Sequence, residues 1–413
     1  MPDSAPIRRW EIDALRGLML VLMTVTHLPT RLTGPLGQPF GFVSAAEGFV
    51  LLSAYMAGMV YGRIAWRQGV HAMRHAFWQR ALKIYACQAA TLLFLFTVIA
   101  FIGLRIEQPA VTDLMAYYLQ HPRSGLVYGL LLVYSPPLLD ILPLYILFML
   151  ASPWVMALAW RHGWARVMGV SVALWVLAQF GLSQWAFRAV SAVMPIPVPY
   201  AETGSFDTWG WQLLWMLGLW MGATRNDPEA PAFVFPTWAA RLALGLALVC
   251  LVWRHGVGQV PFGNHPGLNL LFDKWALGPL RVINLFALMV LALHYGPRLA
   301  ERTPRLRWLE TLGAASLPVF CAHLVVVLLV LGLLGADQSR PWALDLPLLA
   351  LCLGILHAVA RVSLRVHGPS GGHTGLDSAA PPQAPAVEPA PPPEAAAPAQ
   401  PAADDDLPRA AAG

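Results

Sequence analysis

Long apolar segments recur along the chain from Leu15 to Val362, and short polar or Pro- and Gly-containing stretches separate them. A helix of about 17 to 25 apolar residues is long enough to cross a hydrocarbon layer about 30 Å thick. Ten segments fit this description: roughly 14–30, 44–62, 82–104, 139–160, 164–182, 208–223, 237–253, 279–296, 313–334 and 342–362. The pattern predicts an all-α, polytopic integral membrane protein with about ten transmembrane helices.

One apolar stretch does not fit the spanning pattern. Between residues 105 and 138 the run SGLVYGLLLVYSPPLL is too short and too interrupted by proline to span a membrane. We expect it to be re-entrant or to lie on the membrane surface. On the same side, segments 183–207 and 254–278 are long and rich in Pro, Gly, Trp and His. Such loops favour a binding surface, with a simple linker as the alternative.

Composition excludes an ordinary soluble domain, because only 12% of the residues are charged and 57% are hydrophobic, against about 25% charged in soluble proteins. Residues 1–367 hold 26 of the 27 Lys and Arg and 16 of the 22 Asp and Glu. Residues 368–413 are mostly Pro, Ala and Gly with a run of three acids at 404–406, too few bulky apolar residues for a core. The sequence predicts a membrane domain at 1–367 and a disordered cytoplasmic tail at 368–413.

Basic residues predict the orientation, because cytoplasmic loops of membrane proteins are enriched in Lys and Arg. With the N-terminus inside, the predicted inner segments carry seventeen of these residues and the outer loops carry seven. Both termini are therefore predicted to be cytoplasmic. The basic excess follows from this rule, so no nucleic-acid partner is expected.

The N-terminal segment and the cysteines argue against a cleaved signal peptide, a disulfide framework and a metal site. Two arginines precede the first apolar segment as in a signal peptide, but three charged residues interrupt it and no small-residue cleavage site follows, so we expect the first helix to be retained. The four cysteines all lie in apolar runs without CxxC or Cys/His spacing. Neither a disulfide framework nor a metal site is predicted.

Ionisable residues inside the first segment mark a candidate site, because a charge at the bilayer centre costs about 3 kcal/mol. Asp13 and Arg16 are three residues apart and can pair near the inner boundary. Arg16 and His27 are eleven residues apart, about three helical turns, so they share a face and lie about 16 Å apart along the axis. This face is predicted to run from a cytoplasmic ion pair to a histidine near the outer side.

Further ionisable residues lie at matching depths in other segments. Glu47 is predicted about one turn in from the outer face, near His27, where a carboxylate would orient the imidazole as a general base. Arg80 and Lys83 open the third segment near the depth of Arg16, which suits the phosphates of a cytosolic donor. His323 is predicted near the middle of the ninth segment.

Structural explanations compete with these assignments. The acid and arginine of the first segment also fit an inner-leaflet salt bridge, and the two basic residues of the third also follow the positive-inside rule. His27 also suits the interface, and His323 also suits a bond to a backbone carbonyl. Glu47 is harder to explain in this way, because carboxylates within spans usually face a cavity or a partner.

Four short motifs together resemble those of the membrane acyltransferase-3 superfamily. DALRGLMLVLMTVTH has the R-x10-H spacing of its first helix, GFVLLSAYMAG is similar to its FFxxSGF segment, FWQRALKIY to its RRxxRIxPxY segment and AASLPVFCAHL to its SxSLYLxH segment. They occur in the expected order. The chain departs from the pattern at Ala54, Ala86 and residues 319–321, where no Tyr is present, and none of these replaces a proposed catalytic group.

Within this superfamily the chain most resembles the OpgC family over residues 10 to 335, through EIDALRGL, FVSAAEGFVLLSAYMAGMVYG, LLDILPLY, WQLLWMLGLWMG and LGPLRVINLFAL. That family is associated with succinylation of osmoregulated periplasmic glucans. The resemblance implies a bacterial inner-membrane enzyme that moves a succinyl or acetyl group from cytosolic acyl-CoA to a hydroxyl of a periplasmic glycan, without a bound cofactor. By position it implies Arg16, His27, Glu47, Arg80 and His323 as site residues.

The expected mechanism places the donor phosphates near Arg16, Arg80 and Lys83 and uses His27 as a general base or as a transient acyl carrier. A succinyl group would bring a second carboxylate, and Arg281 at the outer start of the eighth segment is the cation that position favours. The alternatives are a transporter or flippase with an intramembrane His/Glu proton relay, and a scaffold protein. No internal repeat or matching pair of broken segments supports a transporter.

Overall fold

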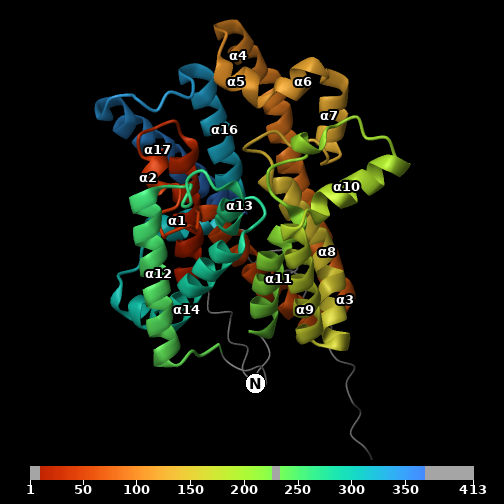
Figure 1. Cartoon of the computed structure of the whole chain (residues 1–413), viewed down its shortest axis with the longest axis vertical. Helices are drawn as coiled ribbons and strands as arrows, with labels where there is room; N and C mark the ends of the chain where they lie inside the picture. The colour runs from red at the N-terminus through yellow and green to blue at the C-terminus, as the bar shows by residue number, and fades with distance from the viewer. Residues whose placement is uncertain (1–9, 226–232, 368–413) are drawn as a thin grey trace, which may run out of the picture. The chain divides into compact units, whose positions relative to one another are not determined.

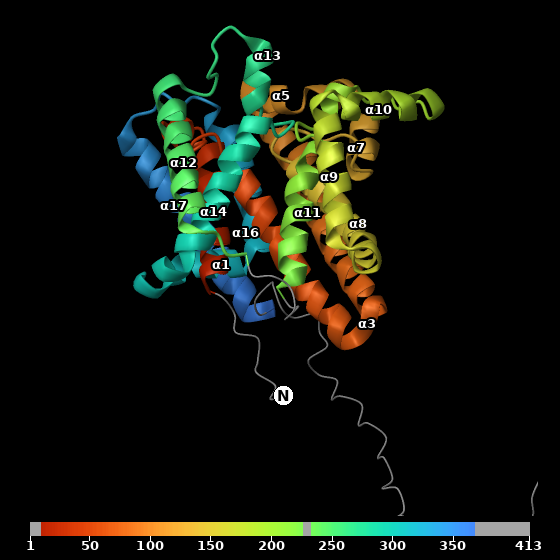
Figure 2. The same cartoon turned by 60° about the horizontal axis from the view of Figure 1, so that its bottom comes forward.

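The structure, a computed structural model, describes residues 10–225 and 233–367 (Figure 1). Every regular element in this part of the chain is a helix. Figures 1 and 2 show α12 and α14 side by side on one side of the membrane domain and α8, α9 and α11 on the other, with α1 and α16 on the side of α12 and α14. The all-α class is confirmed for the described residues, and the predicted tail at 368–413 lies outside them.

Long apolar helices alternate with short connecting ones. The long helices are α1 (Trp10–His27), α3 (Ala45–Phe94), α8 (Ile141–His162), α9 (Trp164–Gln179), α11 (Thr208–Thr224), α12 (Thr237–Val257), α14 (Pro279–Arg302), α16 (Ser316–Leu334) and α17 (Trp342–His367). The short ones are α2 (Thr33–Leu36), α4 (Ala100–Ile106), α5 (Pro109–Leu114), α6 (Ala116–Gln120), α7 (Pro122–Leu130), α10 (Leu182–Val193), α13 (Pro266–Asn269) and α15 (Arg307–Ala314). A π-helical turn (Leu95–Ile99) joins α3 to α4, and 3-10 turns lie at Tyr200–Glu202 and Leu270–Phe272. Each of the ten predicted segments overlaps one or more of these helices.

Six helices of the described part are long and apolar enough to cross a membrane, counting Ala45–Ile106 as one. The bent pair α9 and α10, which turns by 84°, makes a seventh if it is one broken span. Helix α1 carries three charged residues within its 18, and α11 has only 17 residues. The helices are compatible with a membrane protein, while the count of ten and the orientation of the termini stay predictions.

One connection predicted between two spans is itself helical. Helix α3 has 50 residues and contains segment 44–62, the start of segment 82–104 and the polar stretch between them. Gly69 interrupts it with φ +86°, a backbone conformation that favours glycine. The chain reverses direction at this break, because the rings of Tyr61 before it and Phe77 after it lie 4.1 Å apart between centroids. The two predicted segments therefore lie in separate arms of α3, and the helix extends into the polar stretch on either side of Gly69.

The stretch 105–138 contains no spanning helix, as predicted. Helices α5, α6 and α7 have six, five and nine residues, which is too short to cross a bilayer. Their tyrosines pack against neighbouring aromatic rings: the ring of Tyr118 stacks at 3.7 Å between centroids on Phe96 of the π-helical turn, and the ring of Tyr117 lies 5.0 Å from that of Tyr134. These short helices thus form a small aromatic core of their own.

Two glycines let α1 pack tightly against α15. A Cβ atom at Gly17 would lie 2.0 Å from the carbonyl oxygen of Leu309, and one at Gly313 would lie 1.8 Å from that of Asp13. Any larger residue is therefore excluded at this crossing, as is common where membrane helices meet through small residues. The contact fixes α1 against the segment that leads directly into α16.

Candidate active site

Two histidines from different helices meet where α1 ends. His27 is the last residue of α1, and His323 lies within α16. Nδ1 of His27 is 3.0 Å from Nε2 of His323, and the rings stack with centroids 5.3 Å apart. His323 is fully buried, whereas His27 is partly exposed. The sequence indicated both residues separately, and the structure shows that they form a pair.

The hydrogen bonds of this pair indicate which nitrogen carries each proton. Nδ1 of His323 lies 2.9 Å from the carbonyl oxygen of Phe320, and a carbonyl oxygen only accepts, so Nδ1 is the donor. In a neutral ring Nε2 of His323 is then an acceptor, and it receives the N–H of His27 Nδ1. This leaves the lone pair of His27 on Nε2, on the side away from His323.

Arg16 lies further along the same face of α1. Its guanidinium donates to the hydroxyl of Ser316, and its Nη1 is 3.8 Å from the Asp13 carboxylate. All three side chains are almost fully buried. The predicted pairing of Asp13 with Arg16 is present. Because Arg16 pairs with Ser316 and His27 with His323, residue numbers rise in the same direction along α1 and α16, so the two helices are parallel.

A small cavity of about 20 Å³ lies beside Arg16. Its lining comes from α1, α3, α8 and α16: Arg16, Phe49, Ser53, Arg80, Ile84, Leu142, Tyr145, Ser316, Leu317 and Phe320. The hydroxyl of Ser53 is buried there and has no hydrogen-bond partner among the described residues. The structure thus brings Arg80 to the same cavity as Arg16, whereas the side chain of Lys83 is exposed and is not part of the lining.

One aromatic layer connects this cavity to the histidine pair. The rings of Phe49 and Phe320 stack with centroids 5.7 Å apart, and both residues line the cavity. The Phe320 ring also contacts the His323 ring edge to face at 5.1 Å. A group in the cavity is therefore separated from the histidines by the thickness of these phenylalanine rings.

Glu47 does not contact His27, although both were predicted at the same depth in the membrane. Its carboxylate forms an ion pair with Nε of Arg281 on α14 and accepts the hydroxyl of Ser44, with the Ser44 N–H 3.0 Å away. Both charged side chains are almost inaccessible. Glu47 is the third residue of α3, and with Ser44 it forms a capping box. The expectation that Glu47 orients His27 was wrong, because these partners take up both carboxylate oxygens.

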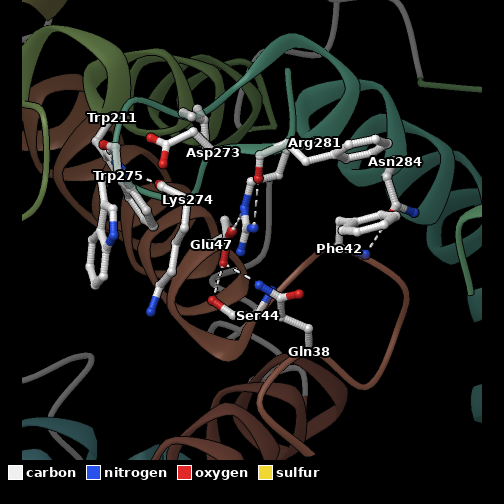
Figure 3. A network of polar contacts seen from close by, with 12 residues as sticks. Gln38, Phe42, Ser44, Glu47, Trp211, Asp273, Lys274, Trp275, Arg281 and Asn284 are labelled. Atoms are coloured by element: carbon white, nitrogen blue, oxygen red, sulfur yellow. Dashed lines mark hydrogen bonds and ion pairs between the residues drawn. The ribbon is translucent and has the colours of Figure 1, made fainter. Parts of the chain in front are cut away.

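The Glu47–Arg281 pair belongs to a larger polar cluster, which Figure 3 shows. Asn284, one turn after Arg281, accepts the N–H of Phe42 at 2.8 Å. Gln38 accepts the Nε of Arg254 at 2.7 Å. We call these residues, together with Lys274, the outer polar cluster. Within it Arg281 pairs with Glu47 through Nε, while its Nη2 is buried and has no hydrogen-bond partner among the described residues. That Arg281 receives a substrate carboxylate stays a prediction.

The charges near the site suit anionic ligands. Two guanidinium groups, of Arg16 and Arg80, line the cavity, and guanidinium groups bind phosphate and carboxylate through charge-assisted bonds. No group of three or more His, Cys, Asp or Glu in the described ranges is arranged to hold a metal ion.

The sequence indicated most of the site residues but not the residues that they bind. Ser316 is the second residue of the segment ASLPVFCAHL, seven residues before His323. This spacing puts both residues on one face of α16, so the sequence did carry a signal for Ser316. The pattern Ser44-x-x-Glu47 is the signature of a helix start and could have assigned Glu47 to a cap. Nothing in the local sequence indicates the pairing of Glu47 with Arg281, 234 residues away.

Comparison with known proteins gives one match. The family model described as OpgC protein matches residues 8–367, which is most of the chain. No curated protein and no solved structure matches it.

Proposed function

The chain belongs to the OpgC family, and from this we propose that it is a bacterial inner-membrane acyltransferase that moves a succinyl or acetyl group from cytosolic acyl-CoA to a hydroxyl of a periplasmic or envelope glycan. The observation that carries the proposal is the His27–His323 pair. It leaves Nε2 of His27 free as a base, and it lies on the same helix face as the arginine-lined cavity.

The donor would occupy the end of the site that we predict to be cytoplasmic. Arg16 and Arg80 would bind the phosphates of CoA, with Lys83 further out on the exposed face of α3. Asp13 and Ser316 hold the Arg16 guanidinium in place. The thioester would then extend past Phe49 and Phe320 toward the histidines.

The transfer itself is a nucleophilic acyl substitution. The acceptor hydroxyl oxygen attacks the thioester carbonyl carbon while Nε2 of His27 takes the hydroxyl proton. The resulting tetrahedral oxyanion collapses, the C–S bond breaks, and the CoA thiolate leaves and receives the proton from the imidazolium. The products are an ester on the glycan and free CoA. Alternatively, His27 attacks first and carries the acyl group to the hydroxyl.

Transfer of a labelled acyl group tests this proposal directly. Membranes containing the protein receive acyl-labelled succinyl-CoA or acetyl-CoA on the cytosolic side and periplasmic glucan on the other. We expect label in the glucan and an equal amount of free CoA, because each transfer cleaves one thioester. Membranes without the protein are the control. Transport of the donor with its thioester intact, and no label in the glucan, would contradict the proposal.

His323 acts through His27, so its substitution should change the rate of transfer more than the binding of the donor. His323→Phe keeps a ring against Phe320 but removes the acceptor for His27 Nδ1–H. We expect kcat to fall by about 10- to 100-fold with an unchanged KM for acyl-CoA, since loss of an orienting partner leaves the base in the wrong tautomer. The measurement is steady-state transfer at varied acyl-CoA.

The conservative variant His323→Gln supplies the control. Its side-chain oxygen can accept the His27 N–H and its amide can donate to the Phe320 carbonyl. We expect it to recover most of the lost kcat. Equal activity of His323→Phe and the wild type would show that His323 has only a packing role.

A further inference from the structure

A buried glutamine lies on the arm of α3 that follows Gly69, which we call the second arm. Gln88 is 1% exposed, and neither its side-chain oxygen Oε1 nor its nitrogen Nε2 has a hydrogen-bond partner among the described residues. A buried polar group without a partner destabilises a folded protein, so native proteins seldom keep one that binds nothing. Gln88 is therefore a candidate for binding a ligand that both donates and accepts a hydrogen bond.

A second buried glutamine has the contacts expected of a purely structural side chain. Oε1 of Gln212 on α11 accepts the hydroxyl of Ser171 at 2.7 Å. Its Nε2 donates to the carbonyl oxygens of Ser171 and Trp209, at 2.7 and 3.0 Å. This amide is bound within the protein at both ends, whereas the equally buried amide of Gln88 is bound at neither.

Contacts between α3 and α16 locate Gln88 along the helix axis. Ile84, one turn before Gln88, lines the same cavity as Phe320 of α16. Leu92, one turn after Gln88, belongs to the same apolar cluster as Leu328 of α16. Residue numbers therefore rise in the same direction along both segments, and the second arm of α3 is parallel to α16.

The π-helical turn that follows α3 continues this register. A Cβ atom at Gly332 of α16 would lie 4.0 Å from Cδ1 of Ile99. In this register Gln88 is level with Leu324, which lies midway between the two contacts on α16. Gln88 is therefore at the depth of the neighbouring His323, which belongs to the histidine pair.

Helix geometry gives a similar depth relative to the arginines that line the cavity. Gln88 is eight residues beyond Arg80, a rise of about 12 Å, whereas His27 is about 16 Å beyond Arg16. Ile84 lies four residues from both Arg80 and Gln88, and residues four apart are neighbours on one face of a helix. Gln88 thus continues the cavity-lining side of the second arm and lies between the arginines and His27, about one turn short of that histidine.

The part of CoA that would extend between these two ends carries the chemistry that Gln88 fits. The pantetheine arm joins the phosphates to the sulfur and contains two secondary amides, one of which is separated from the sulfur only by an ethylene unit. We propose that Gln88 binds this amide, with Oε1 accepting its N–H and Nε2 donating to its carbonyl oxygen. The inference rests on the proposed acyl transfer and adds a residue that recognises the carrier rather than the acyl group.

Entry of the arm requires the Phe320 ring to move. The rings of Phe49 and Phe320 stack between the cavity and the histidines. A donor that reaches His27 has to displace this layer, and Phe320 lies against the cavity together with Ile84, the residue one turn before Gln88. Its displacement opens the space between α3 and α16 at the level of the Gln88 amide.

Kinetics of Gln88→Met test the proposal. Methionine keeps the length and nearly the shape of the side chain but removes both polar atoms. KM for acyl-CoA should rise about 10- to 30-fold with an unchanged kcat, because the amide is bound equally before and during the reaction. The Tm without donor should not fall, since the substitution removes no hydrogen bond of the described residues. A lower kcat with an unchanged KM, or no change in either, would overturn the inference.

Gln212→Met is the matched control, because it makes the same substitution at the buried glutamine that is bound within the protein. It should lower Tm, since Ser171 loses the acceptor for its hydroxyl. The KM of the Gln212→Met protein that remains folded should equal that of the wild type. An equal rise of KM in both variants would contradict a specific role of Gln88.

A modified donor gives a second test that uses the wild-type protein. An acyl-CoA with an ester in place of the amide nearest the sulfur lacks the N–H that Oε1 would accept. The wild type should show a KM about 5-fold higher for this donor than for the normal one, and Gln88→Met should show equal KM values for both. Equal values with the wild type would overturn the inference. If the wild type transfers an acyl group from neither donor, the proposed function fails instead, so the two failures are distinguishable.

Discussion

Replacing His27 with alanine should lower kcat for acyl transfer by at least about 10²-fold. The substitution removes the lone pair on Nε2 that the hydrogen bonds to His323 and Phe320 leave available. His27 is partly exposed at the end of α1, so truncation should leave folding and membrane insertion intact. Transfer of labelled acyl groups at saturating donor measures the effect, normalised to the amount of folded protein.

His294→Ala is the control for this experiment. His294 is a partly buried histidine whose Nδ1 lies 2.9 Å from the backbone carbonyl oxygen of Phe235, and it lies on α14, whereas His27 and His323 lie on α1 and α16. The variant should transfer acyl groups at close to the wild-type rate. Transfer by His27→Ala at that rate would mean that another group takes the hydroxyl proton. CoA release without acceptor separates the two roles of His27, since only an acyl carrier releases one CoA per protein before the acceptor is added.

The first helix could be predicted well from sequence because its signals are local. The spacing of Arg16 and His27 fixes their shared face through the geometry of the helix alone. The structure confirms this face by placing a partner on α16 opposite each residue, Ser316 opposite Arg16 and His323 opposite His27. The ion pair with Asp13 follows from the same local spacing.

Contacts between helices could not be read in the same way. The depth of Glu47 matched that of His27, but depth leaves the direction of a side chain undetermined. Two contacts set the direction of the Glu47 side chain. The capping box with Ser44 turns the carboxylate toward the start of α3, and Arg281 of α14 forms an ion pair with it. The second depends on how distant helices pack, and a single sequence carries no direct signal for that.

Helix α3 shows that hydropathy locates apolar segments but does not locate the ends of helices. Hydropathy correctly located its two apolar parts, but each arm of the helix extends into the polar stretch between them, up to the break at Gly69. A change from apolar to charged residues marks the end of burial, and only residues that disfavour helix, such as a glycine with positive φ, mark a break in the helix itself.

Substitution of Glu47 by glutamine should destabilise the folded protein by about 3 to 5 kcal/mol, because it leaves the buried Arg281 guanidinium without its counter-charge. The neighbouring cations Lys274 and Arg254 would add to the repulsion. Thermal unfolding in detergent measures the effect as a lower Tm. The double variant Glu47→Gln, Arg281→Met should lose less than the sum of the two single variants, since it removes both charges.

Arg305→Met is the matched control, because Arg305 forms an exposed ion pair with Glu310, and exposed pairs contribute less than about 1 kcal/mol. Glu47→Gln should lower Tm clearly more than this control does. The kcat of the Glu47→Gln protein that remains folded should stay within a few-fold of the wild type, because His323 and not Glu47 orients His27. The opposite result, an unchanged Tm with a collapse of kcat, would assign Glu47 to the base and restore the arrangement that helix depth suggested.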